Sequence, residues 1–284
     1  MTSRMYLMGA RMMNDPEFDR LLAEAVAAPF SGWDFSWLDG RWVEEEDAES
    51  RWDYEERARK LVQAADSLLD LGAGGGERLS RLGPFPQLAV ATEAYGPNVP
   101  TATRRLQPLG VQVVRTHPGV HDSRGPQPDG RFAERRLPFQ DASFELVLAH
   151  SSAFCPAEVY RVLRPGGLLL TAQGAPSIPP TLADVLEGPI PAWAQEGQGW
   201  DIDTTLDEAG FATVEKLDAF PKTTYLDIGA VVYALRAVPW TITDFTVERY
   251  REGLHRLHLQ IKREGGFTVR DHHRLLEMRK PAGR

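Results

Sequence analysis

The chain has 284 residues, of which 42% are hydrophobic, so it is long enough to bury a sizeable core in one large or two small domains. Its formal net charge of −8 argues against broad binding of a nucleic acid backbone, which relies on clustered lysine and arginine. The single cysteine, Cys155, excludes an intrachain disulfide framework and a multi-cysteine zinc ribbon. We find no signal peptide and no membrane-length apolar run, and therefore expect a cytoplasmic protein.

The first 53 residues predict a helix followed by an aromatic segment. Asp15 and Pro16 are typical of a helix start, and apolar residues recur on one face of the residues that follow. Four tryptophans then fall between residues 30 and 53, at Trp33, Trp37, Trp42 and Trp52. This favours a loop that caps an apolar partner, although ordinary core packing explains the same residues. A helix over residues 54–64 is expected next.

A glycine-rich run follows the first predicted strand. Residues 67–71 are mostly apolar and predict a buried strand. Beyond them, Gly72, Gly74 and Gly76 permit positive φ angles and let a ligand approach the backbone closely. We expect this turn to open a helix whose free amide groups point at the ligand. The run predicts a nucleoside site, although glycine also ends strands for conformational reasons alone.

Three acidic residues around this run indicate which nucleoside it suits. Residues 87–93 predict a second strand that ends in Glu93, about 20 residues past the glycines, where an acid can accept hydrogen bonds from ribose hydroxyls. A dinucleotide fingerprint requires glycine or alanine where this chain has Glu77. Asp70, just before the turn, repels phosphate and pairs with an ammonium group. The sequence therefore predicts a cationic nucleoside without phosphates.

The fourth predicted strand supplies a candidate for the chemistry. A third strand is expected over 111–115, and the breaker-rich segment 117–130 is expected to be a surface loop. The fourth strand, over 144–149, ends at His150. Ligands of open α/β sheets bind beyond the carboxyl ends of the strands, so His150 is the tentative catalytic residue. A histidine hydrogen-bonded in a structural turn is the alternative.

The last third of the chain predicts a helical insertion before a returning strand. A segment broken by prolines leads into a short helix over 201–209, a strand over 211–217, helices over 223–238 and 247–263, and a strand over 267–278. We expect the two long helices to form a lid. Some of its residues either wall an acceptor pocket or simply pack the helix, namely Tyr225, Ile228, Val232, Leu235 and Trp240.

Two histidines in the second long helix raise the question of a metal. His255 and His258 lie three residues apart. No carboxylate or thiol ligand is evident nearby in the sequence, so no metal site is predicted.

Four segments, in this order, resemble the motifs of the class I S-adenosylmethionine-dependent methyltransferases. They are the acid and glycine run 70–76, Glu93, the stretch 137–147 and the helix, turn and strand 159–170. The resemblance implies an α/β fold with a Rossmann-like sheet of mostly parallel strands, helices on both faces and a helical insertion before the last strand. It implies S-adenosyl-L-methionine as cofactor and S-adenosyl-L-homocysteine as product.

The resemblance also implies a set of cofactor-binding residues, namely Asp70, Gly72, Ala73, Gly74, Glu93, Ala94, Glu134 and His150. The family's usual adenine-contacting acid falls at Ala133 in this chain, with Glu134 beside it. We divide the chain into a helix and tryptophan-rich cap (1–53), a cofactor-binding core (54–221), a substrate lid (222–264) and a returning strand with a tail (265–284).

These expectations favour methyl transfer to a small, largely apolar acceptor by direct in-line displacement. The C-terminal layout is also similar to that of bacterial 23S rRNA guanine-N1 methyltransferases, over residues 54–280. Those enzymes carry a cysteine-rich zinc module that this chain lacks, so RNA methylation is the runner-up. An NAD-dependent reductase is disfavoured by Glu77 and by the lack of a Tyr-x-x-x-Lys pair. A noncatalytic protein that binds S-adenosylmethionine stays open.

Overall fold

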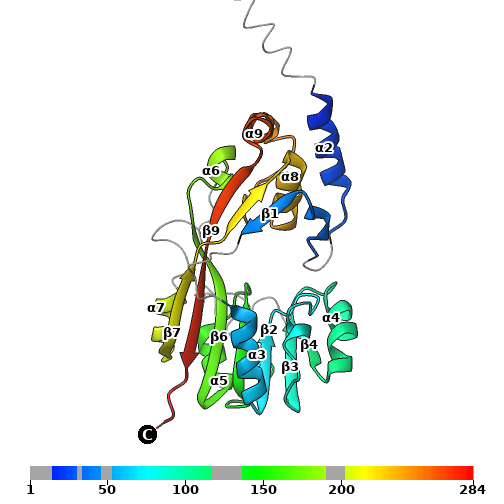
Figure 1. The fold of residues 1–284 in the computed structure, drawn as a ribbon. Coiled ribbons are helices and arrows are strands. Elements are labelled where there is room, and N and C mark those ends of the chain that lie inside the picture. The colour runs from blue at the N-terminus through cyan, green and yellow to red at the C-terminus, as the bar shows by residue number, and fades with distance from the viewer. Residues whose placement is uncertain (1–14, 31–33, 46–52, 117–135, 190–201, 284) are drawn as a thin grey trace, which may run out of the picture.

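Two lobes share one continuous sheet. The computed structural model describes residues 15–30, 34–45, 53–116, 136–189 and 202–283. Within these ranges nine strands form a single sheet in the order β1-β8-β9-β6-β5-β2-β3-β4, and β7 also pairs with β9. The two longest strands, β6 (Leu163–Ile178) and β9 (Phe267–Arg279), run through both lobes (Figure 1).

The lower lobe in Figure 1 is built on parallel strands. Its strands β2 (Ser67–Leu71), β3 (Leu88–Glu93), β4 (Gln112–Arg115) and β5 (Phe144–His150) pair in parallel with their neighbours, and β5 pairs in parallel with β6. Their carboxyl ends point toward the upper lobe. The strands β9 and β7 (Ala212–Ala219) close the sheet in antiparallel fashion. The predicted Rossmann-like fold is confirmed.

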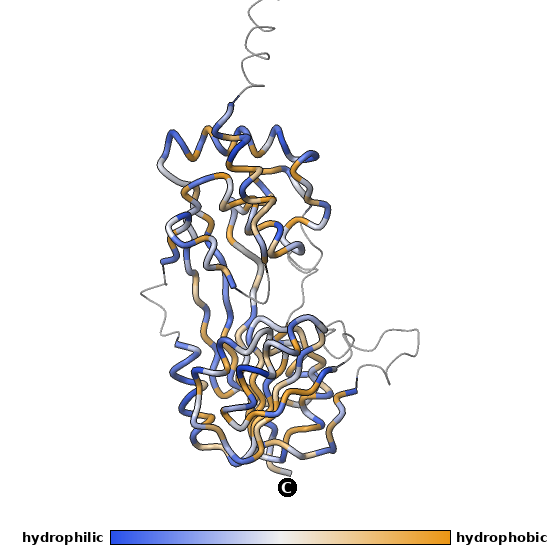
Figure 2. The backbone as a smooth tube through the Cα atoms, turned by 90° about the vertical axis from the view of Figure 1, so that its right-hand side faces the viewer, coloured by the Kyte–Doolittle hydropathy of each residue, from blue (hydrophilic) through white to orange (hydrophobic). Residues whose placement is uncertain are grey.

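Helices cover both faces of these strands because their side chains alternate between two apolar clusters. Leu68, Leu146 and Leu148 pack with α3 (Tyr54–Ala64) and α4 (Val99–Leu106). The intervening Leu69 and Val147 pack with α5 (Pro156–Val162) and α7 (Ile202–Glu208). Figure 2 shows these strands as the most hydrophobic part of the backbone, whereas the stretches of strand between the lobes are largely polar. A sheet buried on both faces is typical of parallel strands.

The upper lobe assembles segments that are far apart in the sequence. It contains α2 (Pro16–Ala27), β1 (Trp42–Glu45), α6 (Leu182–Leu186), β8 (Lys222–Tyr225), α8 (Ile228–Ala237) and α9 (Arg251–Glu264). All of these segments except β1 contribute buried residues to one apolar cluster, and Trp42 of β1 packs against it. Four of the residues expected at an acceptor pocket, Tyr225, Ile228, Val232 and Leu235, are buried in this cluster.

Three sequence expectations need correction. Residues 223–225 are not helical, because they pair in β8 with β9, and α8 begins only after Asp227, whose Oδ1 accepts a hydrogen bond from Ala230 N at 2.9 Å. The tryptophan-rich segment is not simply a loop, because β1 pairs with β8 as an edge strand. No α-helix follows the glycine run. A 3₁₀ turn (Leu79–Arg81) stands in its place, because Pro84 and Pro86 prevent a longer helix before β3.

Candidate functional site

The glycine run forms a tight turn at the carboxyl end of β2. Gly72, Gly74 and Gly76 have φ angles of 72°, 59° and 81°, which glycine adopts without strain. Ala73 N donates to Thr92 O at 2.9 Å, which fixes the turn against β3. The positive φ angles are those expected from the sequence, but no α-helix begins between this turn and β3, so the turn lacks the dipole of the helix that was predicted to follow it.

Glu93 joins the glycine turn to the end of β3. Its side chain is 6% exposed, and its two carboxylate oxygens accept hydrogen bonds from Gly74 N and Tyr95 N, each at 2.7 Å. Each carboxylate oxygen has a second lone pair, so both oxygens keep capacity for hydroxyl donors of a ligand. Glu93 is therefore held in a fixed orientation at the edge where a ribose would lie.

Asp70 lies buried on β2, beside the same edge. Its side chain is 8% exposed, and burial raises the pKa of its carboxyl to about 7, an effect that the charge of Arg78 opposes and that of Glu93 reinforces. The register places Asp70 opposite Leu148 of β5, so it points to the face of the sheet that α3 covers. A buried carboxyl of this kind becomes charged readily once a cation lies next to it.

A cavity of about 480 Å³ opens on this face above the start of α3. Its lining residues are Asp53, Tyr54, Glu55, Glu56, Arg59, Arg78 and His150. His150 ends β5, and its ring meets that of Tyr54 edge to face with centroids 4.7 Å apart. Burial lowers the pKa of His150 to about 3, and the positive charges of Arg78 and His273 act in the same direction. His150 is therefore a neutral imidazole at physiological pH.

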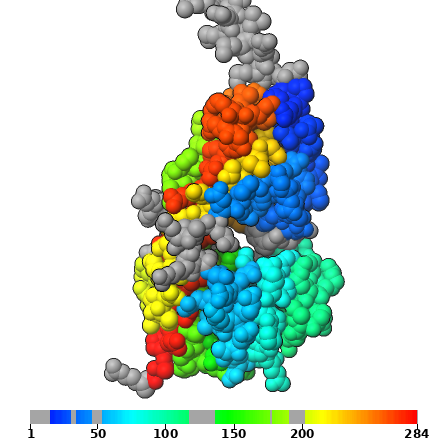
Figure 3. Space-filling view, viewed as in Figure 1, coloured from blue at the N-terminus to red at the C-terminus, as the bar shows by residue number. Residues whose placement is uncertain are grey.

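Between the lobes the same face of the sheet carries titratable side chains. Asp271 and His273 lie on β9 between Val269 and Leu275, and all four side chains are on the same face of the strand. Val269 belongs to the apolar cluster of the upper lobe and Leu275 to that of the lower lobe. Thr223 of β8 pairs with Glu44 of β1 on one side and with Val269 of β9 on the other, so Glu44 lies on this face as well. We call Glu44, Asp271 and His273 the inter-lobe strip. On the face seen in Figure 3 the surface is hollowed at this level.

The strip is electrostatically linked to the cavity. Burial raises the pKa of Asp271 and lowers that of His273, while each of the two charges favours the charged form of the other. His273 in turn lowers the pKa of His150. We did not single out His273 from the sequence. Its signal is the break in the apolar alternation of β9, where Asp271 and His273 occupy positions between Val269 and Leu275.

The remaining predicted residues have varied places. Ala94 directly follows β3, beside Glu93. Glu134 and the loop 117–130 lie outside the described residues. The side chain of Glu77 does not face open space: it forms an ion pair with Arg105 of α4, and the same guanidinium donates to Gly75 O. Cys155 is a buried free cysteine.

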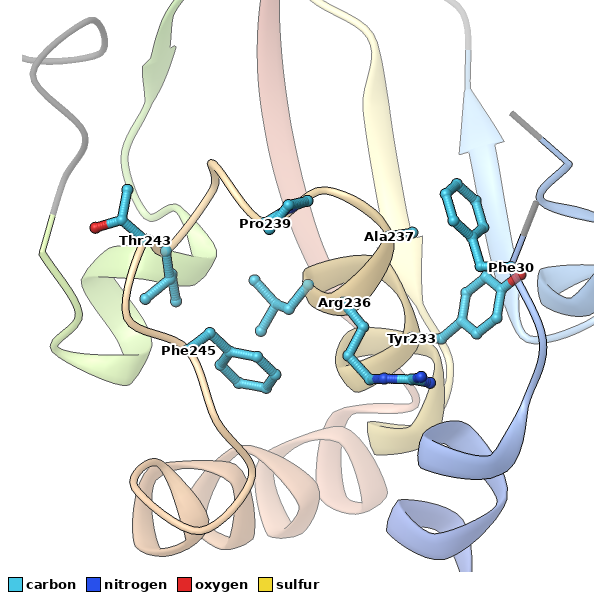
Figure 4. Close-up of a pocket in the computed structure, with 9 residues that line it drawn as sticks. Phe30, Tyr233, Arg236, Ala237, Pro239, Thr243 and Phe245 are labelled. Atoms are coloured by element: carbon cyan, nitrogen blue, oxygen red, sulfur yellow. The ribbon is translucent and has the colours of Figure 1, made fainter. Parts of the chain in front are cut away.

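A second cavity, of about 280 Å³, lies in the upper lobe around the end of α8 (Figure 4). Phe30 and Tyr233 stand at one side and Phe245 at the other, with Arg236 between them. The Tyr233 hydroxyl donates to Pro29 O at 3.2 Å, so the segment after α2 forms part of this region. Of the residues expected to wall an acceptor pocket, only Leu235 lines this cavity, and Trp240 is 45% exposed.

Comparisons with known proteins agree with this architecture. No family model and no curated protein sequence matches the chain. Among solved structures, a putative methyltransferase from Bacillus halodurans C-125 is 19% identical with a TM-score of 0.53, covering 80% of this chain and 98% of its own. The YcgJ protein from Bacillus subtilis is 18% identical with a TM-score of 0.51, covering 81% and 99%.

A functionally unknown protein from Deinococcus radiodurans R1 is 13% identical with a TM-score of 0.50, and the match covers 94% of this chain and 100% of that one. Among the described helices, none combines the length and the apolar character needed to cross a bilayer. With the strand order and the glycine turn described above, these similarities show that the chain has the fold of the class I S-adenosylmethionine-dependent methyltransferases.

Proposed function

We propose that the protein transfers a methyl group from S-adenosyl-L-methionine to a small acceptor molecule. One observation carries the proposal: two buried carboxylates, Asp70 and Glu93, flank a glycine turn at the carboxyl ends of adjacent parallel strands, and a 480 Å³ cavity lined by His150 opens on the same face of the sheet. Ligands of open α/β sheets bind at such an edge. The donor set fits a nucleoside that carries hydroxyl and ammonium groups and no phosphate.

The proposed roles of the site residues follow from their positions. Glu93 would accept the ribose hydroxyls, because its oxygens are oriented by two backbone amides and retain free lone pairs. Asp70 would pair with the ammonium group, and the backbone of Gly72, Ala73 and Gly74 would border the nucleoside. Glu77 and Arg105 neutralise each other beside the turn, so they leave no unpaired cation for a pyrophosphate. This disfavours a dinucleotide.

The sulfonium of S-adenosylmethionine supplies an activated methyl group, so the protein's main task is to hold the acceptor in line with it. His150 would border the acceptor, and as a neutral imidazole it can accept a hydrogen bond that orients a hydroxyl or an amino group of the acceptor. The hollow above it would admit the acceptor between the lobes. S-adenosyl-L-homocysteine would remain as the product.

The structure changes what we expect of the acceptor. The prediction of a largely apolar molecule rested on the aromatic N-terminal segment and on five residues of the insertion, four of which are buried in the core of the upper lobe. The described side chains above the cavity are those of the inter-lobe strip, which are polar or charged. We therefore propose an acceptor with at least one polar group, held near Asp271 and His273.

Isothermal titration calorimetry with S-adenosylmethionine, S-adenosylhomocysteine and NADH tests the cofactor. We expect both sulfur nucleosides to bind and NADH not to bind. Asp70→Ala and Glu93→Ala should each weaken binding about tenfold, as for a lost charge-assisted hydrogen bond. Asp141→Ala is the matched control, because Asp141 is an exposed acid just before the amino end of β5. Tighter binding of NADH, or unchanged affinity in both site variants, would refute the proposal.

A methyl-transfer screen with labelled S-adenosylmethionine tests the acceptor. Small molecules that carry a hydroxyl or an amine are compared with total RNA, and we expect label only in small molecules. With an acceptor in hand, His150→Ala should lower kcat by about tenfold or more and change the affinity for S-adenosylmethionine less. Equal turnover in this variant would leave His150 a purely structural role.

A further inference from the structure

A cluster of polar side chains joins the two helices at the outer end of the upper lobe. Asp15 precedes α2, and its Oδ1 caps the helix by accepting hydrogen bonds from Glu17 N and Phe18 N at 3.2 and 3.1 Å. Its second oxygen, Oδ2, points instead at α9, where His258 Nε2 lies 3.4 Å away and His255 Nε2 3.9 Å away. The Phe18 ring packs against both imidazoles.

His258 is buried in this cluster without a hydrogen bond. Its side chain is 2% exposed, and within the described part of the chain neither ring nitrogen has a hydrogen-bond partner. Leaving a buried polar group unpaired costs about 1–3 kcal/mol. The ligand atoms of Asp15, Glu17 and His258 all lie within 4.8 Å of one another. The imidazole is thus aimed into a group of carboxylates without donating to any of them.

The spacing of these atoms suits two ligands of one metal ion better than a hydrogen bond. An N–H···O hydrogen bond spans about 2.7–3.2 Å. Two ligand atoms at about 2.1 Å from one tetrahedral zinc ion lie about 3.3 to 3.4 Å apart. The chain contains a histidine–carboxylate pair of the ordinary kind for comparison: His272 Nε2 lies 2.8 Å from Asp218 Oδ1. The distance of 3.4 Å between His258 Nε2 and Asp15 Oδ2 is longer than this one, as expected when two ligands share an ion.

We propose that Asp15, Glu17 and His258 bind a divalent transition metal ion of the zinc type, which fastens the start of α2 to α9. Imidazole and carboxylate ligands together suit Zn²⁺, Co²⁺ or Ni²⁺, whereas Mg²⁺ and Ca²⁺ prefer oxygen ligands alone. Glu17 is exposed, so the ion would enter from solvent on that side. Lys262 forms an ion pair with Glu17, and this pair would have to open before Glu17 binds the ion. His255 lies within reach of the same Asp15 oxygen as a further ligand.

The sequence did not predict this site, because no ligand lies near the two histidines along the chain. The carboxylates come from residues about 240 positions earlier, brought next to α9 when α2 packs into the upper lobe. The ion pairs Asp19–Arg251 and Glu17–Lys262 hold the two helices together on either side of the cluster. The proposal does not depend on methyl transfer, because no residue of the glycine turn takes part.

Metal titration of the full chain tests the site. The protein is dialysed against EDTA, freed of chelator and titrated with ZnCl₂ by calorimetry, and with Co²⁺ by visible absorption. We expect one ion per chain and a rise in thermal midpoint when Zn²⁺ is added. His258→Gln and Asp15→Asn should each weaken Zn²⁺ binding at least tenfold. Asn keeps the helix cap, so loss of binding in Asp15→Asn does not come from fraying of α2.

His272→Gln is the matched control, because it removes a histidine that already has a close carboxylate partner. We expect its Zn²⁺ affinity to stay within twofold of the unsubstituted chain. Absence of saturable binding, or a Zn²⁺ affinity in His258→Gln and Asp15→Asn equal to that of the unsubstituted chain, would overturn the proposal. So would a loss in His272→Gln as large as that in His258→Gln, because the ion would then lie elsewhere.

Discussion

The two lobes differ in how the chain builds them. The strands and helices of the lower lobe come almost entirely from residues 54–219, and only β9 returns from the end of the chain. The upper lobe draws on residues near the N-terminus, on α6 and on residues 222–269. The lower lobe contains the polar groups of the proposed cofactor site at its strand ends, whereas the upper lobe has one apolar cluster with its charges at the periphery.

The difference teaches how the cavity arises. One face of β6 and β9 runs through both lobes. On this face α3 covers the part of the strands in the lower lobe, and α8 covers the part in the upper lobe. Neither helix covers the intervening residues, and there the strand carries Asp271 and His273 instead of apolar side chains. A continuous sheet with two separate covers therefore leaves a polar hollow directly above the carboxyl ends of the parallel strands. This is the position where the proposed cofactor and acceptor would meet.

The substitution with the largest expected effect on stability tests whether the two lobes unfold together. Leu254 of α9 is fully buried in the upper lobe, and Leu254→Ala should lower the free energy of unfolding by about 2–5 kcal/mol. Leu259→Ala on the same helix is the control, because that side chain is 44% exposed and should change stability by less than about 0.5 kcal/mol. Since β6 and β9 are shared, urea denaturation followed by circular dichroism should give a single transition in all three proteins. Two separate transitions would show that the lobes are independent.

The sequence predicted the strands of the lower lobe and the long helices of the upper lobe, but it missed the short strands of the upper lobe, for a physical reason. In the lower lobe, a strand, a glycine turn, a second strand and its final acid follow one another within short stretches, so local patterns such as 67–76 and 88–93 identify them. In the upper lobe, β1 and β8 are four-residue strands stabilised by each other and by β9. Their sequences alone favour a loop or a helix, and only the tertiary pairing makes them strands.

The second prediction concerns Asp70 and the pH dependence of stability. The raised folded-state pKa of about 7 means that the folded protein holds a proton on Asp70 where the unfolded chain does not. Stability from this group is therefore lost as pH rises from about 4 to 7, by roughly 4 kcal/mol at most. Asp70→Asn, which never ionises, should be more stable than the unsubstituted protein at pH 8 and equally stable at pH 4.

Urea denaturation at both pH values measures this effect, and calorimetry on the same samples should show that Asp70→Asn has lost affinity for S-adenosylmethionine. A gain of stability with a loss of binding distinguishes a ligand site from a structural core. Asp141→Asn is the control, because a hydrogen bond from Arg161 lowers the pKa of Asp141 and reverses the sign. If Asp70→Asn is less stable than the unsubstituted protein at pH 8, the carboxylate is a structural ion and the contrast between the lobes fails.

The site was only partly predictable from the sequence. Asp70, Glu93 and His150 follow from the rule that ligands bind at strand ends, and the structure places all three on one face of the sheet. His273 belongs to a strand more than 120 residues away from His150, and only the pairing of β6 with both β5 and β9 brings the two histidines to the same face. Local patterns carry no information about such a neighbour.

The smallest expected effect compares two glycines of the lower lobe with the same backbone conformation. Gly76 and Gly110 have φ angles of 81° and 83°, so alanine costs about 1–2 kcal/mol of backbone strain at either position. A Cβ at Gly76 would lie 2.9 Å from Leu106 Cγ, whereas a Cβ at Gly110 would meet nothing within 4 Å. Gly76→Ala should therefore lower the free energy of unfolding by a further 1–3 kcal/mol or so, measured by urea denaturation.

The pair also tests what holds the glycine turn in place. Leu106 belongs to the apolar cluster beneath α4, so displacing it at Gly76 should shift the turn and weaken binding of S-adenosylmethionine in Gly76→Ala. Gly110 follows the same end of α4, but a Cβ there would displace no side chain, so the affinity of Gly110→Ala should stay unchanged. If both variants lose the same stability and neither loses affinity, the turn is independent of the core below it. The turn would then be held by its hydrogen bonds to β3, from Gly74 N to Glu93 Oε2 and from Ala73 N to Thr92 O.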